Sequence, residues 1–331
     1  MSRNTMNLLL TVMVGIMTVV TGLAEDKYLV RLNMKKGDTH RFGQVMDNSV
    51  TMHEVTRKMH MFSLYEWKCS DAKEDQFTVT VSIKRMVLRQ NRGPTKMCFD
   101  SANDATFKGT IGLLRAVTHV SYDVVFNKRG EVMDVVIPPD TMATAIKAAG
   151  ITTPQQQNVA KMMLATIVNK EKLKGQLQEI TRGNCPENAV GVGDTWEQNN
   201  TITEPFPIQI QGTHKLMKVD GDILHIDYQG KVTTPVQSGS QPAKSPRLTG
   251  TQQAKIQINK ESGFVVSSDL HQTLSLTVQQ GKNQVTNTHI RIVSKKKELE
   301  QVLKDEDRLT AAALSEQVPA MAPPPAAPAG K

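Results

Sequence analysis

The sequence is poor in aromatic residues, and its positive charge is not gathered into patches. Aromatic residues make up 4% of its 331 residues. The formal net charge is +8, yet the basic residues are scattered along the chain. Surfaces that bind nucleic acid combine clustered positive charge with stacking aromatic rings. The composition therefore indicates a generally basic surface and argues against nucleic acid as a partner.

Cysteine is also scarce, with Cys69, Cys98 and Cys185 as the three examples. Their spacing matches no zinc-binding pattern. Because three is an odd number, at least one thiol stays outside any disulfide within the chain. Two interpretations remain open: a single bridge, such as Cys69 to Cys98, or three buried thiols that act as small apolar side chains.

Motifs of the common enzyme classes are missing. The sequence has no Gly-x-Ser-x-Gly elbow and no phosphate-binding P-loop. Met52–Glu54 and Met59–Met61 offer thioether and imidazole groups that would suit copper(I). However, His53 and His60 are an odd number of residues apart and would face opposite sides of one strand. We therefore name no catalytic, cofactor-binding or metal-binding residue.

Long apolar runs are missing beyond the first 24 residues. In that stretch Arg3 is the single charged residue, and a largely apolar run follows over residues 8–20. Such a run is shorter than the roughly 20 residues that span a bilayer. Gly22 and Ala24 then place small residues where a signal peptidase cleaves. The sequence predicts a signal peptide over 1–24, cleaved after Ala24, and export to a bacterial periplasm or cell envelope without a remaining membrane span.

What the sequence does contain is alternation of apolar and polar residues. Residues 77–84 read Phe-Thr-Val-Thr-Val-Ser-Ile-Lys, and similar segments recur near 28–34, 122–126, 224–228, 254–258 and 274–278. A period of two predicts strands with one buried face, as in antiparallel sheets. Asp220-Gly221, between two such segments, predicts a hairpin turn.

Helical signals are confined to the middle and the end of the chain. Thr153, followed by Pro154, is typical of a helix start. We expect a helical insert at about 140–174, in which Met162, Met163 and Ile167 are candidates for contact with an apolar ligand; ordinary core packing is the alternative. A charged helix is expected over 294–317. An Ala/Pro tail over 318–331 is too poor in apolar surface to fold.

Several short stretches resemble one family of exported bacterial proteins. The matching pieces are 32–39, 99–101, 122–136 and 192–196, and the most specific is Gly193-Asp194-Thr195-Trp196. The chain resembles this family, which is a domain of unknown function, in its Gly-Asp-Ser/Thr-Trp motif. The resemblance covers about residues 27–293 and implies no activity, cofactor or catalytic residue. Read physically, Gly193 and Asp194 turn the chain, Thr195 starts a strand and Trp196 buries an apolar ring.

Together these patterns predict an α+β, β-rich fold over residues 25–293. We expect a large curved antiparallel sheet, half-barrel-like, with the central helical insert against its concave face; a β-sandwich with a helical insert is the alternative. The first architecture is similar to that of exported lipid carriers of the lipoprotein-localisation type. We therefore expect a non-catalytic binding or carrier protein for an apolar or amphipathic small molecule. The alternatives are an envelope structural or interaction protein that docks an envelope protein through the C-terminal helix, and an enzyme of unrecognised type.

Overall fold

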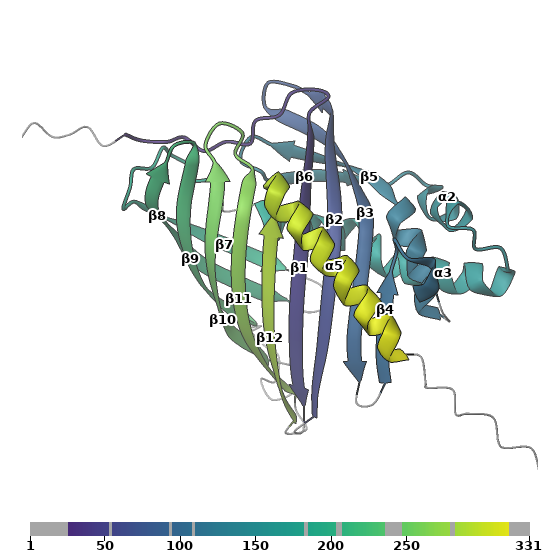
Figure 1. The fold of residues 1–331 in the computed structure, drawn as a ribbon. Coiled ribbons are helices and arrows are strands. Elements are labelled where there is room, and N and C mark those ends of the chain that lie inside the picture. The colour runs from purple at the N-terminus through teal and green to yellow at the C-terminus, as the bar shows by residue number, and fades with distance from the viewer. Residues whose placement is uncertain are drawn as a thin grey trace, which may run out of the picture.

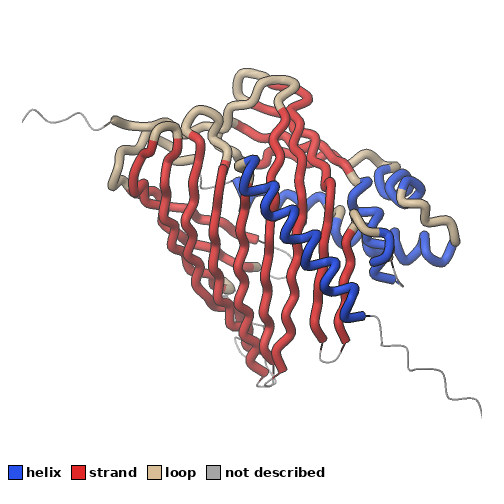
Figure 2. The backbone as a smooth tube through the Cα atoms, viewed as in Figure 1, coloured by secondary structure: helices blue, strands red, loops and turns tan. Residues whose placement is uncertain are grey.

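The computed structural model of the protein describes residues 26–52, 55–92, 95–107, 110–181, 185–202, 207–235, 247–278 and 282–317. The expected signal peptide and the Ala/Pro tail lie outside these residues. Within them, twelve strands form one antiparallel sheet (Figures 1 and 2). The strands are β1 (Thr39–Met52), β2 (Val55–Ala72), β3 (Gln76–Arg92), β4 (Thr95–Asp100), β5 (Ser121–Asn127), β6 (Val132–Val136), β7 (Thr195–Ile202), β8 (Ile208–Asp220), β9 (Ile223–Thr233), β10 (Arg247–Asn259), β11 (Val265–Val278) and β12 (Lys282–Val293).

The sheet is built from two wings that meet at its centre. Its order is β6-β5-β3-β2-β1-β12-β11-β10-β9-β8-β7, and β4 pairs with β3. Strands β1–β6 form one wing, and strands β7–β12 form the other. Antiparallel pairing of β1 with β12, from Gly43 opposite Val293 to Met52 opposite Gln284, joins the wings. The predicted large, curved antiparallel sheet is confirmed, and because the strands form a single sheet the β-sandwich alternative is wrong.

The pairing register assigns each side chain to one face of this sheet. Residues directly opposite each other share a face, so Phe42 with Tyr65 lies on the inner, concave side. Val45 with Phe62 lies on the outer side. The alternation in β3 is confirmed, because Phe77, Val79 and Val81 are all buried in the main core. Phe77, Val79 and Val81 therefore point inward, as their period requires.

The register also determines whether Cys69 and Cys98 can form a disulfide bond. Cys69 lies opposite Val79 on the inner face, whereas Cys98 lies opposite Arg89 on the outer face. A bridge between Cys69 and Cys98 is therefore wrong, since the sheet separates them. All three thiols are free and buried. Burial raises the pKa of Cys185 to about 11, so this thiol stays protonated near neutral pH.

The central helices cover one side of the inner face. They are η1 (Asp104–Thr106), η2 (Thr110–His119), α2 (Thr141–Ala148), α3 (Pro154–Ile167) and α4 (Lys170–Thr181). Thr153 caps α3 as predicted, because its hydroxyl accepts a hydrogen bond from the Gln156 amide at 3.4 Å. The insert extends to Thr181, past the expected end at 174. The 3₁₀ helix η2 had no sequence signal, yet it contributes Ala116 and Val117 to the core.

Helix α5 (Lys296–Gln317) lies obliquely across the outer face of the central strands (Figure 1). Leu299 and Val302 pack there against Phe62 and other buried residues of β1, β3 and β12. Gly43 allows this close approach, because a Cβ there would come within 2.9 Å of Leu299 Cδ1. The C-terminal helix is thus part of the folded core, and its apolar side is occupied by the protein's own sheet.

A polar cluster fixes the second half of α5. Glu306 is 3% exposed, and its carboxylate accepts a hydrogen bond from His60 Nε2 at 3.0 Å and pairs with Arg89. His60 Nδ1 in turn lies 2.8 Å from Asp47 Oδ1. Burial alone would lower the pKa of His60, but its hydrogen bonds to Asp47 and Glu306 raise it to about 8. The imidazole is therefore held as a cation between two carboxylates, with the Arg89 charge opposing it.

This arrangement predicts a pH dependence of stability. A histidine pKa raised from 6.5 in the unfolded chain to about 8 stabilises the fold below pH 6.5, and the contribution is lost as pH rises through 8. We expect the free energy of unfolding of the wild type to fall by about 1 kcal/mol between pH 7 and 8.5. In the His60→Gln variant this fall should be absent. Urea unfolding of both proteins at the two pH values measures the difference, and equal slopes with pH would contradict the assignment.

Candidate functional site

The inner face of the sheet encloses a cavity of about 380 Å³. Strands of both wings form its wall, and η2, α3 and α4 contribute Val117, Ile167, Val168, Leu173 and Leu177 from the opposite side. Sites for small molecules are typically concave, mostly apolar and about 300–1,000 Å³ in volume. The cavity falls in this range.

The part of the cavity lining that the structure describes carries no charged side chain. Most of it is aliphatic or aromatic, and its polar members are mainly side-chain amides: Gln44, Gln198, Asn200, Gln252 and Gln272. Among the described residues that line it, there is no aspartate, glutamate, lysine or arginine. Burying an unpaired charge is costly, whereas an amide can offer a donor and an acceptor to a neutral group. The cavity therefore suits an uncharged molecule with few polar atoms.

The rings of His214 and Tyr228, from β8 and β9, form one part of this wall, and the ring of Trp196 from β7 lies beside them. The Trp196 and His214 rings stack with centroids 5.2 Å apart, and the rings of His214 and Tyr228 follow at 4.6 Å. The Tyr228 hydroxyl lies 3.0 Å from Gln252 Oε1, to which it donates. Gly212 and Gly230 make room for the Tyr228 side chain, since a Cβ on Gly212 would come within 2.3 Å of its ring and a Cβ on Gly230 within 2.3 Å of its hydroxyl. The glycines thus position the tyrosine across the cavity wall.

His214 is the most unusual polar group of this wall. It is 2% exposed, and burial lowers its pKa to about 4, so the ring is neutral at physiological pH. Its Nδ1 has no hydrogen-bond partner among the described residues. A buried nitrogen without a partner is costly and calls for an explanation. A polar atom of a bound molecule would supply that partner.

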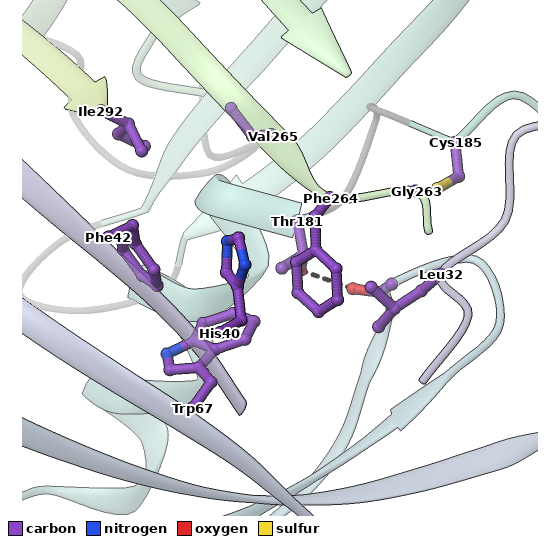
Figure 3. Close-up of a pocket in the computed structure, with 11 residues that line it drawn as sticks. Leu32, His40, Phe42, Trp67, Thr181, Cys185, Gly263, Phe264, Val265 and Ile292 are labelled. Atoms are coloured by element: carbon purple, nitrogen blue, oxygen red, sulfur yellow. Dashed lines mark hydrogen bonds between the residues drawn. The ribbon is translucent and has the colours of Figure 1, made fainter. Parts of the chain in front are cut away.

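A small chamber of about 40 Å³ adjoins the main cavity (Figure 3). It shares Phe42, Trp67, Val265 and Ile292 with the cavity. The His40 ring stacks on Phe264, with centroids 4.2 Å apart. Burial lowers the pKa of His40 to about 4, so this ring is neutral as well. The chamber has room for a few water-sized groups and extends the uncharged interior toward Cys185.

The candidate ligand contacts from the sequence separate in the structure. Ile167 lines the cavity. Met163 is half-buried and packs against the main core. Met162 is 73% exposed, so its side chain points away from the interior and leaves the candidate set. Helical spacing had placed all three on one face, but the crossing of α3 over the core buries the side that carries Ala160 and Leu164 instead.

The Gly193-Asp194-Thr195-Trp196 segment turns the chain into β7. Gly193 has a φ of +94°, which favours glycine. The Asp194 carboxylate accepts a hydrogen bond from the Gly191 amide at 2.9 Å, and the Asp194 carbonyl accepts one from Leu216 at 3.0 Å. Thr195 begins the strand, and Trp196 packs half-buried beside His214. These contacts fit the structural role that the residues suggested.

Sequence reasoning did not single out His214, Tyr228 or Gln252. Their alternation with polar neighbours showed which residues share a face, but not which strands lie side by side. The Met-His segments also gave no site. Met61 lines the cavity and His60 points to the outer face, whereas His53 and Glu54 lie outside the described residues.

The fit of Tyr228 over its glycines can be tested by a double-mutant cycle. We expect Gly212→Ala to lower the free energy of unfolding by about 1–3 kcal/mol, because the added methyl overlaps the ring. The loss should shrink when Tyr228 is replaced by leucine, since the overlap then disappears. Gly175→Ala is the control: nothing lies within 4 Å of its Cβ position, and it should not destabilise. Purely additive losses would show that the ring does not lie over Gly212.

No described helix is both long enough and apolar enough to cross a membrane. No match was found among curated proteins. Lipovitellin, in a structure concerned with lipid–protein interactions, aligns at 13% identity and a TM-score of 0.48, over 80% of this chain and 25% of that chain. The translocator domain of the autotransporter NalP from Neisseria meningitidis aligns at 9% identity and a TM-score of 0.15, over 79% and 89%. Likenesses this distant do not indicate what the cavity binds.

The family comparison is more specific. The model of a family of unknown function, DUF6263, matches residues 74–265. This range runs from the start of β3 through the central helices to the first residue of β11, and so includes much of the cavity wall. The match covers more than half of the chain, and the protein belongs to the DUF6263 family.

Proposed function

We propose that the protein is a carrier that holds an uncharged apolar or amphipathic molecule inside its curved sheet. The observation that carries the proposal is the cavity of about 380 Å³, whose described lining has no charged side chain. An ordinary core fills such a space with its own side chains. Here the space is left open between the sheet and the central helices.

The distribution of polar groups narrows the ligand class. Gln252 and Tyr228 lie on one side of the cavity, near the unpartnered Nδ1 of His214. Gln44 comes from β1, at the junction of the two wings, and Gln272 comes from β11, which pairs with β12 of that junction. A molecule with an apolar chain and a hydroxyl, ester or amide group would pair with these side chains and fill the rest of the space. A long-chain alcohol or a monoacylglycerol has this chemistry.

The central helices are the part of the wall that would have to move for entry. Helix α4 supplies Leu173 and Leu177 to the cavity. Two polar interactions join this helix to β6 and the turn before it. Lys170 forms an ion pair with Asp134 at 2.7 Å, and the Thr181 hydroxyl donates a hydrogen bond to the Gly130 carbonyl. The ion pair is exposed and weak. Displacement of this cover would open the cavity while leaving the strand pairing intact.

We further propose that the carrier works outside the cytoplasm, in the periplasm or cell envelope. The proposal rests on the first 24 residues, where one basic residue, a short apolar run and small residues before Glu25 have the pattern of a signal peptide. Neutral lipid-like molecules need a protein to cross an aqueous compartment, because their apolar chains are poorly soluble in water.

Filling the cavity should abolish binding. Ala254 lies on the inner face of β10 and lines the cavity, whereas the neighbouring Gln253 is exposed on the outer face. We expect Ala254→Leu to weaken binding of Nile red, an uncharged fluorescent probe, by about tenfold, or about 1.4 kcal/mol. Gln253→Leu adds the same side chain outside and should leave binding unchanged. Fluorescence titration measures both, and equal affinities for the two variants would contradict the proposed site.

Ligand charge should matter as much as ligand size. A monoacylglycerol and the fatty acid with the same chain differ in whether the head carries a carboxylate. We expect the neutral compound to displace Nile red at about one tenth of the concentration needed for the fatty acid at pH 8, because no described lining residue can pair with the anion. Tighter binding of the fatty acid would contradict the uncharged-ligand assignment.

A further inference from the structure

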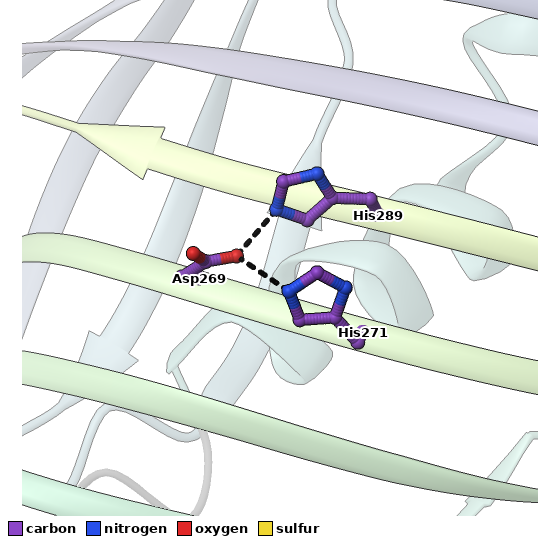
Figure 4. Close-up of side chains that lie close together, drawn as sticks. All are labelled: Asp269, His271 and His289. Atoms are coloured by element: carbon purple, nitrogen blue, oxygen red, sulfur yellow. Dashed lines mark hydrogen bonds and ion pairs between the residues drawn. The ribbon is translucent and has the colours of Figure 1, made fainter.

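A cluster of metal-ligating side chains lies on the outer face of β11 and β12, away from the cavity. It consists of Asp269, His271 and His289 (Figure 4). His271 and His289 are directly opposite each other across the two strands, and Asp269 precedes His271 by two residues on the same face. Their inward neighbours Leu270 and Ile290 line the cavity. The cluster and the cavity are therefore on opposite sides of the same wall.

The two imidazoles point at one carboxylate oxygen. His271 Nε2 lies 3.2 Å from Asp269 Oδ1, and His289 Nε2 forms a close hydrogen bond to the same atom. The rings are stacked, with centroids 4.2 Å apart and planes 6° from parallel. The three ligand atoms all lie within 4.8 Å of one another. Ligand atoms around a zinc ion sit about 2.0–2.2 Å from it, so small side-chain adjustments would bring all three into contact with one ion.

We propose that Asp269, His271 and His289 bind one divalent transition-metal ion, with zinc as the best fit. Two imidazoles and a carboxylate are a donor set that suits zinc, copper(II) and nickel. Calcium and magnesium prefer oxygen ligands throughout. Water completes the coordination, because the three side chains are partly or largely exposed.

The backbone holds the cluster in place before an ion arrives. Pairing of β11 with β12 runs from Ser267 opposite Val293 to Val278 opposite Lys282 without a register shift. The two histidines therefore cannot slip past each other without disturbing the whole hairpin. The ion would link the two strands through their side chains, which makes the site a clamp on the cavity wall as well as a binding site.

The charged groups around the cluster come from three neighbouring strands. Asp47 of β1 lies opposite His289, while Lys255 of β10 and Arg291 of β12 lie opposite Asp269. The two cations reduce the attraction of the Asp269 carboxylate for a metal ion. The imidazoles then supply most of the affinity, so the site favours zinc over harder ions of the same charge.

Titration of the full mature chain with zinc chloride tests the proposal. After removal of metals by a chelator, isothermal calorimetry should show one zinc ion per chain. We expect His271→Asn and His289→Asn each to weaken zinc binding at least about tenfold, since each removes one of three ligands. His225→Asn is the matched control, because His225 is a partly exposed histidine of β9 outside the cluster.

Copper(II) provides a second readout that does not depend on affinity. Its electron paramagnetic resonance spectrum should show coupling to two imidazole nitrogens in the wild type and to one in either histidine variant. Circular dichroism would establish that the variants are folded. Equal zinc binding by the wild type and the His271→Asn/His289→Asn double variant would overturn the proposal. A stoichiometry of one ion per two chains would also overturn it, because the ion would then bridge molecules.

Discussion

The pairing of β1 with β12 is the interaction on which the rest of this structure depends. It joins residues about 250 positions apart in sequence and turns two antiparallel wings into one curved sheet. On the outer face of this strand pair, Val45 and Val293 belong to the apolar surface on which α5 packs. On the inner side, Met46 and Ile290 face the cavity. Contacts so distant in sequence carry a high cost in loop-closure entropy. The burial of apolar surface on both faces of the strand pair offsets that cost.

The two faces of the sheet are covered in different ways. Helix α5 covers part of the outer face of the central strands through Leu299, Val302 and the buried Glu306. The inner face is covered incompletely by η2, α3 and α4, and an uncharged space remains. In the proposed carrier, this arrangement would let the central helices move over a ligand while the strands stay paired.

Local patterns in the sequence were enough to predict the faces of the strands. The alternation at Phe77–Ile83 and the Asp220-Gly221 turn both correspond to what the structure shows, with the turn joining β8 to β9. The helix start at Thr153 was equally local, because a cap depends on residues three positions apart. The helix expected at 294–317 begins at Lys296, but its burial on the outer face was not predicted. The alternative function, docking of an envelope protein through this helix, would need an apolar side that is already packed against the protein's own sheet.

Local sequence patterns could not predict either candidate site, because each site combines residues from several strands. His214 and Tyr228 face each other only through the pairing of β8 with β9, and His271 meets His289 through that of β11 with β12. Such pairings follow from strand order and register, which a period of two leaves undetermined. The α3 candidates failed in part for a related reason: spacing fixed the helix face, but the crossing of α3 over the core decided which side is buried, and Met162 was left outside.

The central claim is that the interior of the sheet holds a ligand, and native mass spectrometry of the chain after Ala24, purified from an exporting host, tests it most directly. The account predicts a stoichiometric adduct that solvent extraction identifies as an uncharged apolar or amphipathic molecule. It also predicts that the adduct forms when ligand-free protein is incubated with monoacylglycerol. A ligand-free mass that persists after such incubation, in protein shown to be folded, would contradict the claim.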